Sequence, residues 1–196
     1  MSSNKDYFNS KAELWDNIVD HDLKKVQRII DLVEIKKGDK ILDVGTGTGV
    51  LIPVLQACVG DQGQITAIDI AEKMIEVAKR KFDYSNVEFV VGDVLEKGVS
   101  DSDFDCIICY SMFPHFEDKK AAISTLAKHL KKNGKLVICH SQSRDAINHL
   151  HQEIPGPVQE DRLPSMDILK QMFESADINV SLEIDDEELF VIIGLL

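Results

Sequence analysis

This sequence is short of basic residues, of long apolar runs and of paired cysteines. Its 22 lysines and arginines stand against 34 acidic residues, which gives a formal net charge of −12. Contact with nucleic-acid phosphates requires a basic face, so the charge argues against a nucleic-acid partner. No apolar run approaches the roughly 20 residues of a membrane span, and the polar opening at 1–6 does not predict a secretory leader. We therefore expect a cytoplasmic protein without a membrane span.

Cysteine occurs four times, and the spacing of the four residues is not that of a zinc ribbon. Cys106 and Cys109 lie in the centre of an apolar run that predicts a strand. Side chains three positions apart on a strand point to opposite faces, so we do not expect these two thiols to share a ligand. Buried free thiols are the expectation for a protein of the cytoplasm.

The stretch at 41–50 is the most informative part of the chain. An apolar run at 40–44 predicts a buried strand, and a helical apolar pattern begins at Val50. Between them, Gly45 and Gly47 permit positive φ and leave room for a ligand against the backbone. Strand, glycine turn and helix form the layout of a first nucleotide-binding crossover, in which the amides that open the helix face the ligand.

Two acidic residues indicate which nucleotide would fit this turn. The glycines follow G-x-G-x-G and not the G-x-G-x-x-G that brings a pyrophosphate onto a helix N-terminus. Asp43 stands two residues before the first glycine, so a ligand with a positive charge near the turn fits better than an anion. Asp69 ends the next predicted strand, at the place where a carboxylate binds ribose hydroxyls in such folds. The alternative is a glycine turn that binds nothing, with both acids capping helices.

The chain resembles the class I S-adenosylmethionine-dependent methyltransferases over roughly its whole length. Three motifs carry the resemblance, in the order and spacing of that family: Leu42-Asp43-Val44-Gly45-Thr46-Gly47-Thr48-Gly49, Ala67-Ile68-Asp69-Ile70-Ala71-Glu72-Lys73-Met74 and Val91-Gly92-Asp93-Val94. The resemblance implies one α/β domain over 1–196, with a Rossmann-like, doubly wound, seven-stranded mixed sheet. That sheet would be mostly parallel, with a C-terminal antiparallel hairpin and with helices on both faces.

The apolar pattern places the elements of this sheet. Strands are predicted at 40–44, 64–69, 87–91, 104–110, 135–140, 179–184 and 189–193, and helices at 50–59, 71–82, 119–132 and 165–175. Strands that alternate with helices indicate a parallel sheet covered on both faces. Two further helices, broken at 20–22, are expected between 12 and 33, with residues 1–11 frayed. By resemblance, the segment 1–34 would form a helical lid, for which Tyr7, Phe8 and Trp15 are candidates; packing onto the sheet alone is the alternative.

The resemblance also assigns the cofactor contacts. Gly45, Thr46 and Gly47 would line the methionine and ribose part of S-adenosylmethionine, next to Asp43. The residues on the nucleoside side would be Asp69 on the ribose, Ile70 and Met74 on the adenine ring, and Asp93 with the Val94 amide at its amino group. Tyr110, Ser111 and Phe116 would surround the sulfonium. Because a methionine on an apolar helix face is more often plain core, Met74 is the least specific of these residues.

The loop after the fourth predicted strand narrows the choice of methyl acceptor. Methyltransferases that act on exocyclic base amines or on glutamine usually carry an Asn/Asp/Ser-Pro-Pro-aromatic tetrapeptide here. This chain has Ser111-Met112-Phe113-Pro114-His115 instead, which argues against DNA and glutamine as acceptors. The Asp-Asn pair of the metal-dependent catechol type is also not evident after the fifth strand.

The segment 140–163 is the most individual part of the sequence, and we expect it to gate the substrate. Read as a helix, it places Arg144, Asn148 and His151 on one polar face that we expect to line the acceptor site. Arg144 would then hold a carboxylate or a phosphate. His115 or His140 is the candidate base, since histidine titrates near neutrality. For each histidine a surface or structural role is the alternative.

A soft-metal site is a further possibility near these histidines, but their spacing is irregular. It would group His140, His149 and His151 with Cys109 or Cys139. We predict that no metal is bound.

The resulting prediction is a methyltransferase that transfers the methyl group of S-adenosylmethionine to a small-molecule acceptor, as a monomer or a homodimer. It resembles most the branch that includes the ubiquinone- and menaquinone-biosynthesis methyltransferases, although no acceptor-side residue specifies a quinone. Two alternatives stay open: a non-catalytic protein that senses S-adenosylmethionine, and a nicotinamide-dependent oxidoreductase. G-x-G-x-G and Asp43 disfavour the latter.

Overall fold

A single seven-stranded sheet runs through the protein. The computed structural model describes residues 4–96 and 103–196, so the first three residues of the expected lid lie outside the described part. The strand order is β3-β2-β1-β4-β5-β7-β6. The strands are β1 (Lys40–Val44), β2 (Gln64–Asp69), β3 (Val87–Val91), β4 (Phe104–Tyr110), β5 (Leu130–His140), β6 (Asn179–Asp185) and β7 (Phe190–Leu195).

The direction of the strands confirms the predicted fold class. β1 pairs in parallel with both β2 and β4, and the parallel pairing continues to β3 on one side and β5 on the other. β7 is antiparallel to β5 and to β6, so the last two strands form the predicted C-terminal hairpin. The order reverses between β1 and β4, which is where ligands bind in open sheets of this type.

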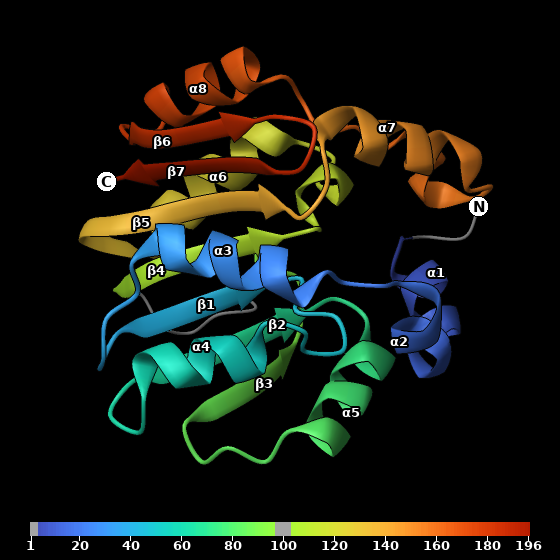
Figure 1. Ribbon diagram of the computed structural model, residues 1–196, viewed down its shortest axis with the longest axis horizontal. Coiled ribbons are helices and arrows are strands. Elements are labelled where there is room, and N and C mark those ends of the chain that lie inside the picture. The colour runs from blue at the N-terminus through green and yellow to red at the C-terminus, as the bar shows by residue number, and fades with distance from the viewer. Residues whose placement is uncertain (1–3, 97–102) are drawn as a thin grey trace.

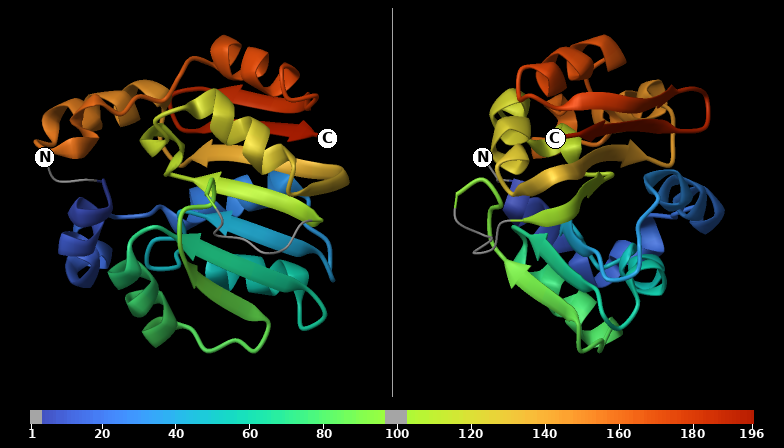
Figure 2. Two further views of the ribbon diagram at one scale, coloured as in Figure 1. Left: turned by 180° about the vertical axis from the view of Figure 1, so that it is seen from behind. Right: turned by 90° about the vertical axis from the view of Figure 1, so that its left-hand side faces the viewer.

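Helices cover both faces of the sheet (Figures 1 and 2). α3 (Leu23–Val33) and α4 (Ile52–Val59) lie on one face, and α6 (Lys119–Ala127) and α8 (Met166–Glu174) lie on the other. α5 (Glu72–Lys81) packs beside β3. The short helices α1 (Asn4–Lys11) and α2 (Trp15–Ile18) and the helix α7 (Arg144–Glu153) project beyond the ends of the parallel strands (Figure 1).

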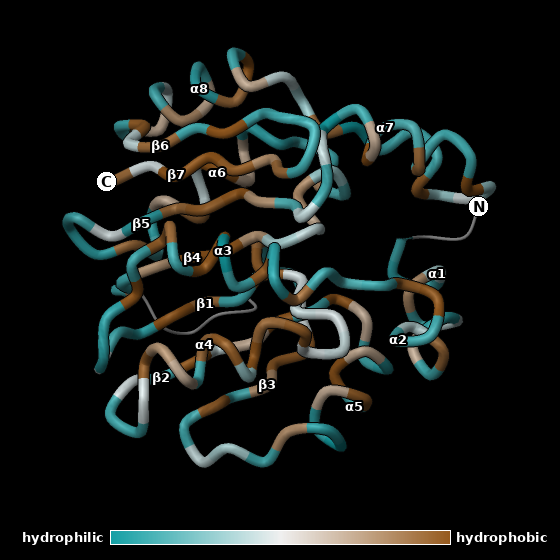
Figure 3. Tube along the Cα trace, in the orientation of Figure 1, coloured by the Kyte–Doolittle hydropathy of each residue, from teal (hydrophilic) through white to brown (hydrophobic). Residues whose placement is uncertain are grey.

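The sheet separates the two larger apolar clusters of the core. One contains Phe104 and Ile107 of β4 with the buried faces of α6 and α8, and the other contains Ile108 of β4 with α3 and α4. The hydropathy colouring shows the same pattern, with brown strands inside and mainly teal loops outside (Figure 3). Cys106 and Cys109 belong to different clusters, as their spacing predicts, and all four cysteines are free.

The predicted helix at 119–132 is wrong beyond Ala127. β5 already begins at Leu130, which pairs with Phe104 of β4. The backbone groups of the Lys-Lys-Asn-Gly segment are satisfied by the sheet: Asn133 donates to Leu196, whose amide donates to Gly134. Asn133 adopts a φ of 64°, and a Cβ on Gly134 would lie 2.8 Å from the carbonyl oxygen of Lys131. What resembles a helix end in the sequence is therefore an irregular start of a strand.

The expectation that residues 1–11 are frayed is wrong for 4–11, because Asn4–Lys11 forms α1, and residues 1–3 lie outside the described part. No residue of α1 is buried, so side-chain bridges hold it in place. Asn9 donates to Glu72 at 3.1 Å and accepts the amide of Lys73 at 3.0 Å, and Lys5 pairs with Glu72 at 3.1 Å. Patterns of apolar residues do not reveal a helix that is anchored by polar contacts.

The segment 140–163 contains two helices, as its length allows. α7 begins after Ser143, whose hydroxyl accepts the amide of Ala146 at 3.2 Å. A short 3-10 helix, η3 (Pro157–Glu160), follows, and the chain then returns to α8. None of the helices in the described ranges is long and apolar enough to cross a membrane.

Candidate active site

A cavity of about 1150 Å³ opens at the carboxyl ends of the parallel strands. Its floor is formed by the residues that end or follow β1, β2, β4 and β5, as expected for a sheet of this topology. α1 and α2 enclose one side, and α7 with η3 encloses another. The cavity is thus large enough for a nucleoside and a second small molecule together.

The glycine turn after β1 is packed tightly against the loop after β4. Gly45 has a φ of 67°, and a Cβ added there would lie 2.7 Å from the Cβ of Met112. The amides of Gly45 and Thr46 donate to the carbonyl of Ile68 at 2.8 and 3.0 Å. Since these amides are already used inside the protein, the turn offers a ligand its shape and its neighbouring carboxylates more than free donors.

Asp69 is held in place by two backbone amides. Its Oδ1 accepts the amide of Ala71 at 2.8 Å and its Oδ2 accepts the amide of Gly47 at 2.9 Å. Burial raises the pKa of this carboxyl, while the two amide hydrogen bonds oppose that shift. Each carboxylate oxygen keeps a further lone pair, so the side chain is set to accept hydrogen bonds from a pair of ligand hydroxyls.

Asp43 is the most deeply buried acid of the cavity, with 1% of its surface exposed. The hydroxyl of Thr46 donates to its Oδ2 at 2.6 Å. Burial raises the pKa of Asp43 to about 7, against the effect of that hydrogen bond, and the charge of Asp69 raises it further. A ligand that carries a positive charge here would relieve the repulsion between the two carboxylates.

The predicted nucleoside-side residues all line the cavity. Met74 is buried on α5, whereas Ile70 is 40% exposed at the rim. Asp93 accepts the amide of Leu95 at 2.8 Å, which fixes the turn that carries Val94. The structure brings these four side chains to the Asp69 end of the cavity, and their contacts with adenine stay a prediction.

Aromatic side chains from the N-terminal helices close the cavity from outside. Phe8 packs edge-on against Trp15, with ring centroids 5.6 Å apart, and both contact the cluster around Met74. The indole nitrogen of Trp15 lies 4.0 Å from the position of a Cβ built on Gly47. Tyr7, Phe8 and Trp15 all line the cavity, and the role of this segment as a lid stays a prediction.

Tyr110 links three parts of the wall. Its hydroxyl lies 3.0 Å from Nδ1 of His21, which precedes α3, and 2.8 Å from Oγ of Ser141, which follows β5. Burial raises the pKa of Tyr110 and lowers the pKa of His21. Both groups therefore stay uncharged near neutrality and contribute hydrogen bonds to the site.

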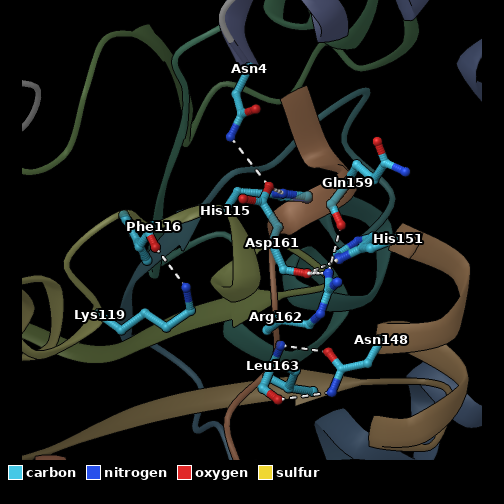
Figure 4. A network of polar contacts seen from close by, with 10 residues as sticks. All are labelled: Asn4, His115, Phe116, Lys119, Asn148, His151, Gln159, Asp161, Arg162 and Leu163. Carbon is cyan, nitrogen blue, oxygen red and sulfur yellow. Dashed lines mark hydrogen bonds and ion pairs between the residues drawn. The ribbon is translucent and has the colours of Figure 1, made fainter. Parts of the chain in front are cut away.

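Two histidines meet at Asp161 (Figure 4), and all three residues line the cavity. Nδ1 of His115 lies 2.6 Å from Oδ2 of Asp161, and Nδ1 of His151 lies 3.1 Å from the backbone oxygen of the same residue. The two imidazole centroids are 5.2 Å apart. Asn4 of α1 donates to the Asp161 carboxylate at 3.4 Å, so this residue also touches the N-terminal cover.

His140 lies at the end of β5, where it was predicted, and lines the cavity with 1% of its surface exposed. Neither ring nitrogen has a hydrogen-bond partner among the described residues. Burial lowers the pKa of His140 to about 3, and the nearby His115 and His151 add to that effect. The side chain is thus a neutral imidazole that lacks a partner in the protein.

The expectation that the polar face of α7 lines the acceptor site is wrong for two of its three residues. Arg144 is not part of the cavity wall; its guanidinium lies 2.9 Å from Asp145 and 3.7 Å from Asp185 of β6. Asn148 exchanges two hydrogen bonds with the backbone of Leu163. The apolar face of α7 lines the cavity instead, through Ile147, Leu150 and Ile154. The returning chain covers the polar face of the helix and buries its polar groups.

The soft-metal alternative does not fit the structure. No group of three or more His, Cys, Asp or Glu side chains in the described ranges is placed to hold a metal ion. His149 points away, with a 70% exposed side chain 3.7 Å from Glu153. Burial raises the pKa of Cys109 and Cys139, so both thiols stay protonated.

Sequence reasoning missed Asp161, Asn4 and His21. Asp161 lies in an irregular segment between two helices, and its neighbours follow no period. His21 lies in the break between two predicted helices, where a polar residue is ordinary. All three are brought to the cavity by long-range folding, so no local signal marks them.

Residues 35–180 match the model of a protein family described as "Methyltransferase domain". A curated relative, the demethylmenaquinone methyltransferase of Staphylococcus aureus strain JH9, is 32% identical over 140 residues. The match covers 70% of this chain and 58% of the relative, so the chain spans little more than half the length of that protein.

Solved structures share the fold. A SAM-dependent methyltransferase from Aquifex aeolicus superposes with a TM-score of 0.74 at 24% identity, over 95% of this chain and 97% of the other. The magnesium protoporphyrin IX methyltransferase from Synechocystis PCC 6803, solved with bound SAH, gives a TM-score of 0.69 at 18% identity, over 97% and 96% of the two chains. At these identities the likeness concerns the architecture.

Proposed function

Since the chain belongs to the methyltransferase domain family, we propose that it transfers the methyl group of S-adenosylmethionine to a small-molecule acceptor. The observation that carries the proposal is the pair of buried carboxylates, Asp43 and Asp69, on either side of the glycine turn. A dinucleotide pyrophosphate would meet negative charge at this place. A ligand with ribose hydroxyls and positive charges meets complementary groups.

In this proposal the cofactor lies across the ends of β1, β2 and β3. Asp69 accepts hydrogen bonds from the ribose hydroxyls, and Ile70, Met74, Asp93 and the Val94 amide enclose the adenine. The methionine part follows Gly45, Thr46 and Gly47 towards Asp43, and Tyr110 stands beside the sulfonium. The cofactor and the acceptor then occupy opposite ends of one cavity.

The protein contributes alignment and exclusion of water to the transfer itself. A sulfonium methyl group reacts when the nucleophile lies in line with the carbon–sulfur bond, and a closed apolar cavity keeps water from that position. The acceptor end is walled by Phe8, Phe116, Ile147, Leu150, Ile154 and Val158. These apolar walls favour an acceptor with a ring or another apolar body.

The named relative acts on demethylmenaquinone, and a quinone-like acceptor agrees with apolar walls. We place the enzyme in the cytoplasm as part of the proposal, since its four cysteines are unpaired. A monomer and a homodimer both agree with a cavity that one chain encloses.

A sensor that binds S-adenosylmethionine without catalysis is the second candidate. The paired His115 and Asp161 at the acceptor end favour the enzyme, because a sensor has no need of an oriented imidazole there. Release of labelled methyl to a panel of small aromatic acceptors separates the two functions. Binding without transfer to any acceptor would support the sensor.

Trp15 allows the cofactor assignment to be tested directly. It is the only tryptophan of the chain and lines the cavity, so its fluorescence should change when S-adenosylhomocysteine binds. Asp69→Ala removes two charged hydrogen-bond acceptors and should weaken binding by about 1.5–3 kcal/mol. Asp61→Ala, in an exposed turn, is the matched control and should bind like the wild type. Binding of NAD, or an unchanged affinity in Asp69→Ala, would overturn the assignment.

A further inference from the structure

The acceptor end of the cavity contains an oriented acid–base pair. We infer that His115, held by Asp161, is the general base of the transfer, and that the acceptor is an uncharged aromatic molecule with a weakly acidic hydroxyl. This inference rests on the proposed function and adds to it the proton acceptor and the class of the nucleophile.

Asp161 fixes the orientation of two imidazoles at once. Its carboxylate accepts from Nδ1 of His115 at 2.6 Å, and its backbone carbonyl accepts from Nδ1 of His151 at 3.1 Å. A carboxylate and a carbonyl only accept hydrogen bonds, so each Nδ1 carries a proton. Nε2 of each ring then has a free lone pair, and no hydrogen bond joins either Nε2 to another described residue. The carboxylate also stabilises the imidazolium that forms when His115 takes a proton.

The other two histidines are poor bases in this environment. Burial lowers the pKa of His140 to about 3, and it lowers the pKa of His151 as well. Both rings therefore stay neutral and serve as hydrogen-bond partners. The fully buried His140, whose two nitrogens have no described partner, would find one in a polar group of the acceptor.

The charges around the cavity select an uncharged acceptor. Lys5 is the only lysine or arginine among the described residues that line it, and Lys5 is already paired with Glu72 at 3.1 Å. Arg144 lies outside and pairs with two aspartates. Among the described residues that line the cavity, no lysine or arginine is thus left for a carboxylate or phosphate, and the walls are largely apolar.

Proton transfer to an imidazole is efficient only from a group of comparable acidity. A hydroxyl on an aromatic ring meets that condition much better than an aliphatic alcohol does. Phe8 and Phe116 both contribute rings to the wall, which suits a flat acceptor. An aromatic hydroxyl is therefore the nucleophile that this pair of residues can activate.

The proposed step involves only the two substrates and His115, and all bonds, protons and electron pairs are accounted for among them. Nε2 of His115 takes the hydroxyl proton as the acceptor oxygen forms a bond to the methyl carbon. The carbon–sulfur bond breaks, and its electron pair stays on sulfur, which becomes the neutral thioether of S-adenosylhomocysteine. His115 then releases its proton to solvent after the products leave.

The charged and titratable groups around His115 come from four elements. They are Asp161 after η3, His151 of α7, His140 of β5 and Asp69 of β2, and Lys119 faces Asp161 from α6. Of these groups, only Asp161 forms a hydrogen bond with the side chain of His115.

Two naphthols separate a base from a structural residue. 1-Naphthol is protonated at neutral pH, whereas 4-nitro-1-naphthol is already ionised and needs no base. In His115→Gln, methylation of 1-naphthol from S-adenosylmethionine should fall by about 100-fold. Methylation of the ionised 4-nitro-1-naphthol, which is slower in the wild type because the cavity disfavours its charge, should change little. Asp161→Asn should show the same selectivity with a smaller loss. His149→Gln changes an exposed histidine of α7 and is the matched control, which should methylate both naphthols like the wild type.

Binding of S-adenosylhomocysteine, followed by Trp15 fluorescence, verifies that each variant is folded. An equal loss with both naphthols, or no loss with 1-naphthol, would overturn the role of His115. If the wild type methylates 1-naphthylmethylamine but neither naphthol, the acceptor class is wrong and the proposed function stays intact. If the wild type binds no S-adenosylhomocysteine, the proposed function itself fails.

Discussion

Asp43 illustrates how one buried residue links stability to cofactor binding. Its pKa is raised to about 7 by burial and by the charge of Asp69, so the folded protein holds a proton that the unfolded chain has lost. Below about pH 4 the carboxyl is protonated in both states and does not lower the free energy of unfolding. As pH rises through 7, the loss in the free energy of unfolding grows to about 4 kcal/mol and then stays constant.

Asp43→Asn should therefore stabilise the free protein at high pH. The amide keeps an acceptor for the Thr46 hydroxyl at the same place but carries no charge. We expect no gain near pH 4 and a gain of up to about 4 kcal/mol near pH 8, measured by urea unfolding. The same variant should bind S-adenosylmethionine more weakly. A gain that does not depend on pH would show that Asp43 does not titrate in this range.

At the scale of single residues, the sequence predicted the acids of the glycine turn but not Asp161. Asp43 and Asp69 could be found because each lies at the end of a strand, just before a turn, and local patterns reveal both the strand and the turn. Asp161 depends on the path of the chain after α7 and on the position of His115, 46 residues away. Its role is set by tertiary contacts, which a local pattern does not encode.

At the scale of elements, Asn148 fastens α7 to the segment that carries Asp161. Its Oδ1 accepts the amide of Leu163 at 2.7 Å and its Nδ2 donates to the carbonyl of the same residue at 3.1 Å. Asn148→Ala should destabilise the protein by roughly 1–3 kcal/mol, since two partly buried hydrogen bonds are lost. Methyl transfer should fall, while the affinity for S-adenosylhomocysteine should change little.

Arg144→Ala is the control on the same helix. Its ion pairs with Asp145 and Asp185 lie outside the cavity and are partly exposed, so its loss should cost less than about 1 kcal/mol. Thermal unfolding and turnover should both stay close to those of the wild type. A large loss of activity in Arg144→Ala would show that this residue contributes to the acceptor site.

The elements that the sequence misplaced share a physical cause. The sequence predicts a helix up to residue 132, but His129 and Leu130 pair with Phe104 of β4, and Asn133 pairs with the C-terminal residue. The segment that forms α7 can be read as a helix from its sequence, yet the apolar face of this helix and not its polar face lines the cavity. Sequence periodicity locates an amphipathic helix well, but it does not say whether the apolar side faces the core or a ligand.

At the scale of the whole molecule, the sheet could be predicted almost completely. Four of the strands, at 40–44, 64–69, 87–91 and 104–110, have the predicted bounds, because continuous apolar runs between turn residues leave little choice. The doubly wound, mostly parallel character of the sheet followed from the resemblance. The position of the N-terminal helices over the cavity depends instead on polar bridges between distant residues, and these became visible only in the structure.

The N-terminal helices join the two halves of the cavity. Asp16 of α2 accepts a hydrogen bond from the hydroxyl of Thr48 in the glycine turn at 2.5 Å and pairs with Lys81 of α5 at 2.6 Å. Asn4 reaches Asp161 at the acceptor end. Since α1 and α2 bury no residue of their own, their stability depends on these bridges and on whatever fills the cavity below them.

We therefore expect the cofactor to order this cover. Amides of α1 and α2 should exchange with deuterium more slowly when S-adenosylhomocysteine is bound, because opening the cover then requires its release. At a ligand concentration of 100 times Kd, this coupling amounts to at most about 2.7 kcal/mol, or roughly 100-fold in exchange rate. Amides of the turn at 60–63, which precedes β2 at the opposite end of the parallel strands, should keep their rate. Asp16→Ala, which removes the link between the glycine turn and α5, should reduce the protection, whereas equal protection of the cover and the turn would contradict this closure.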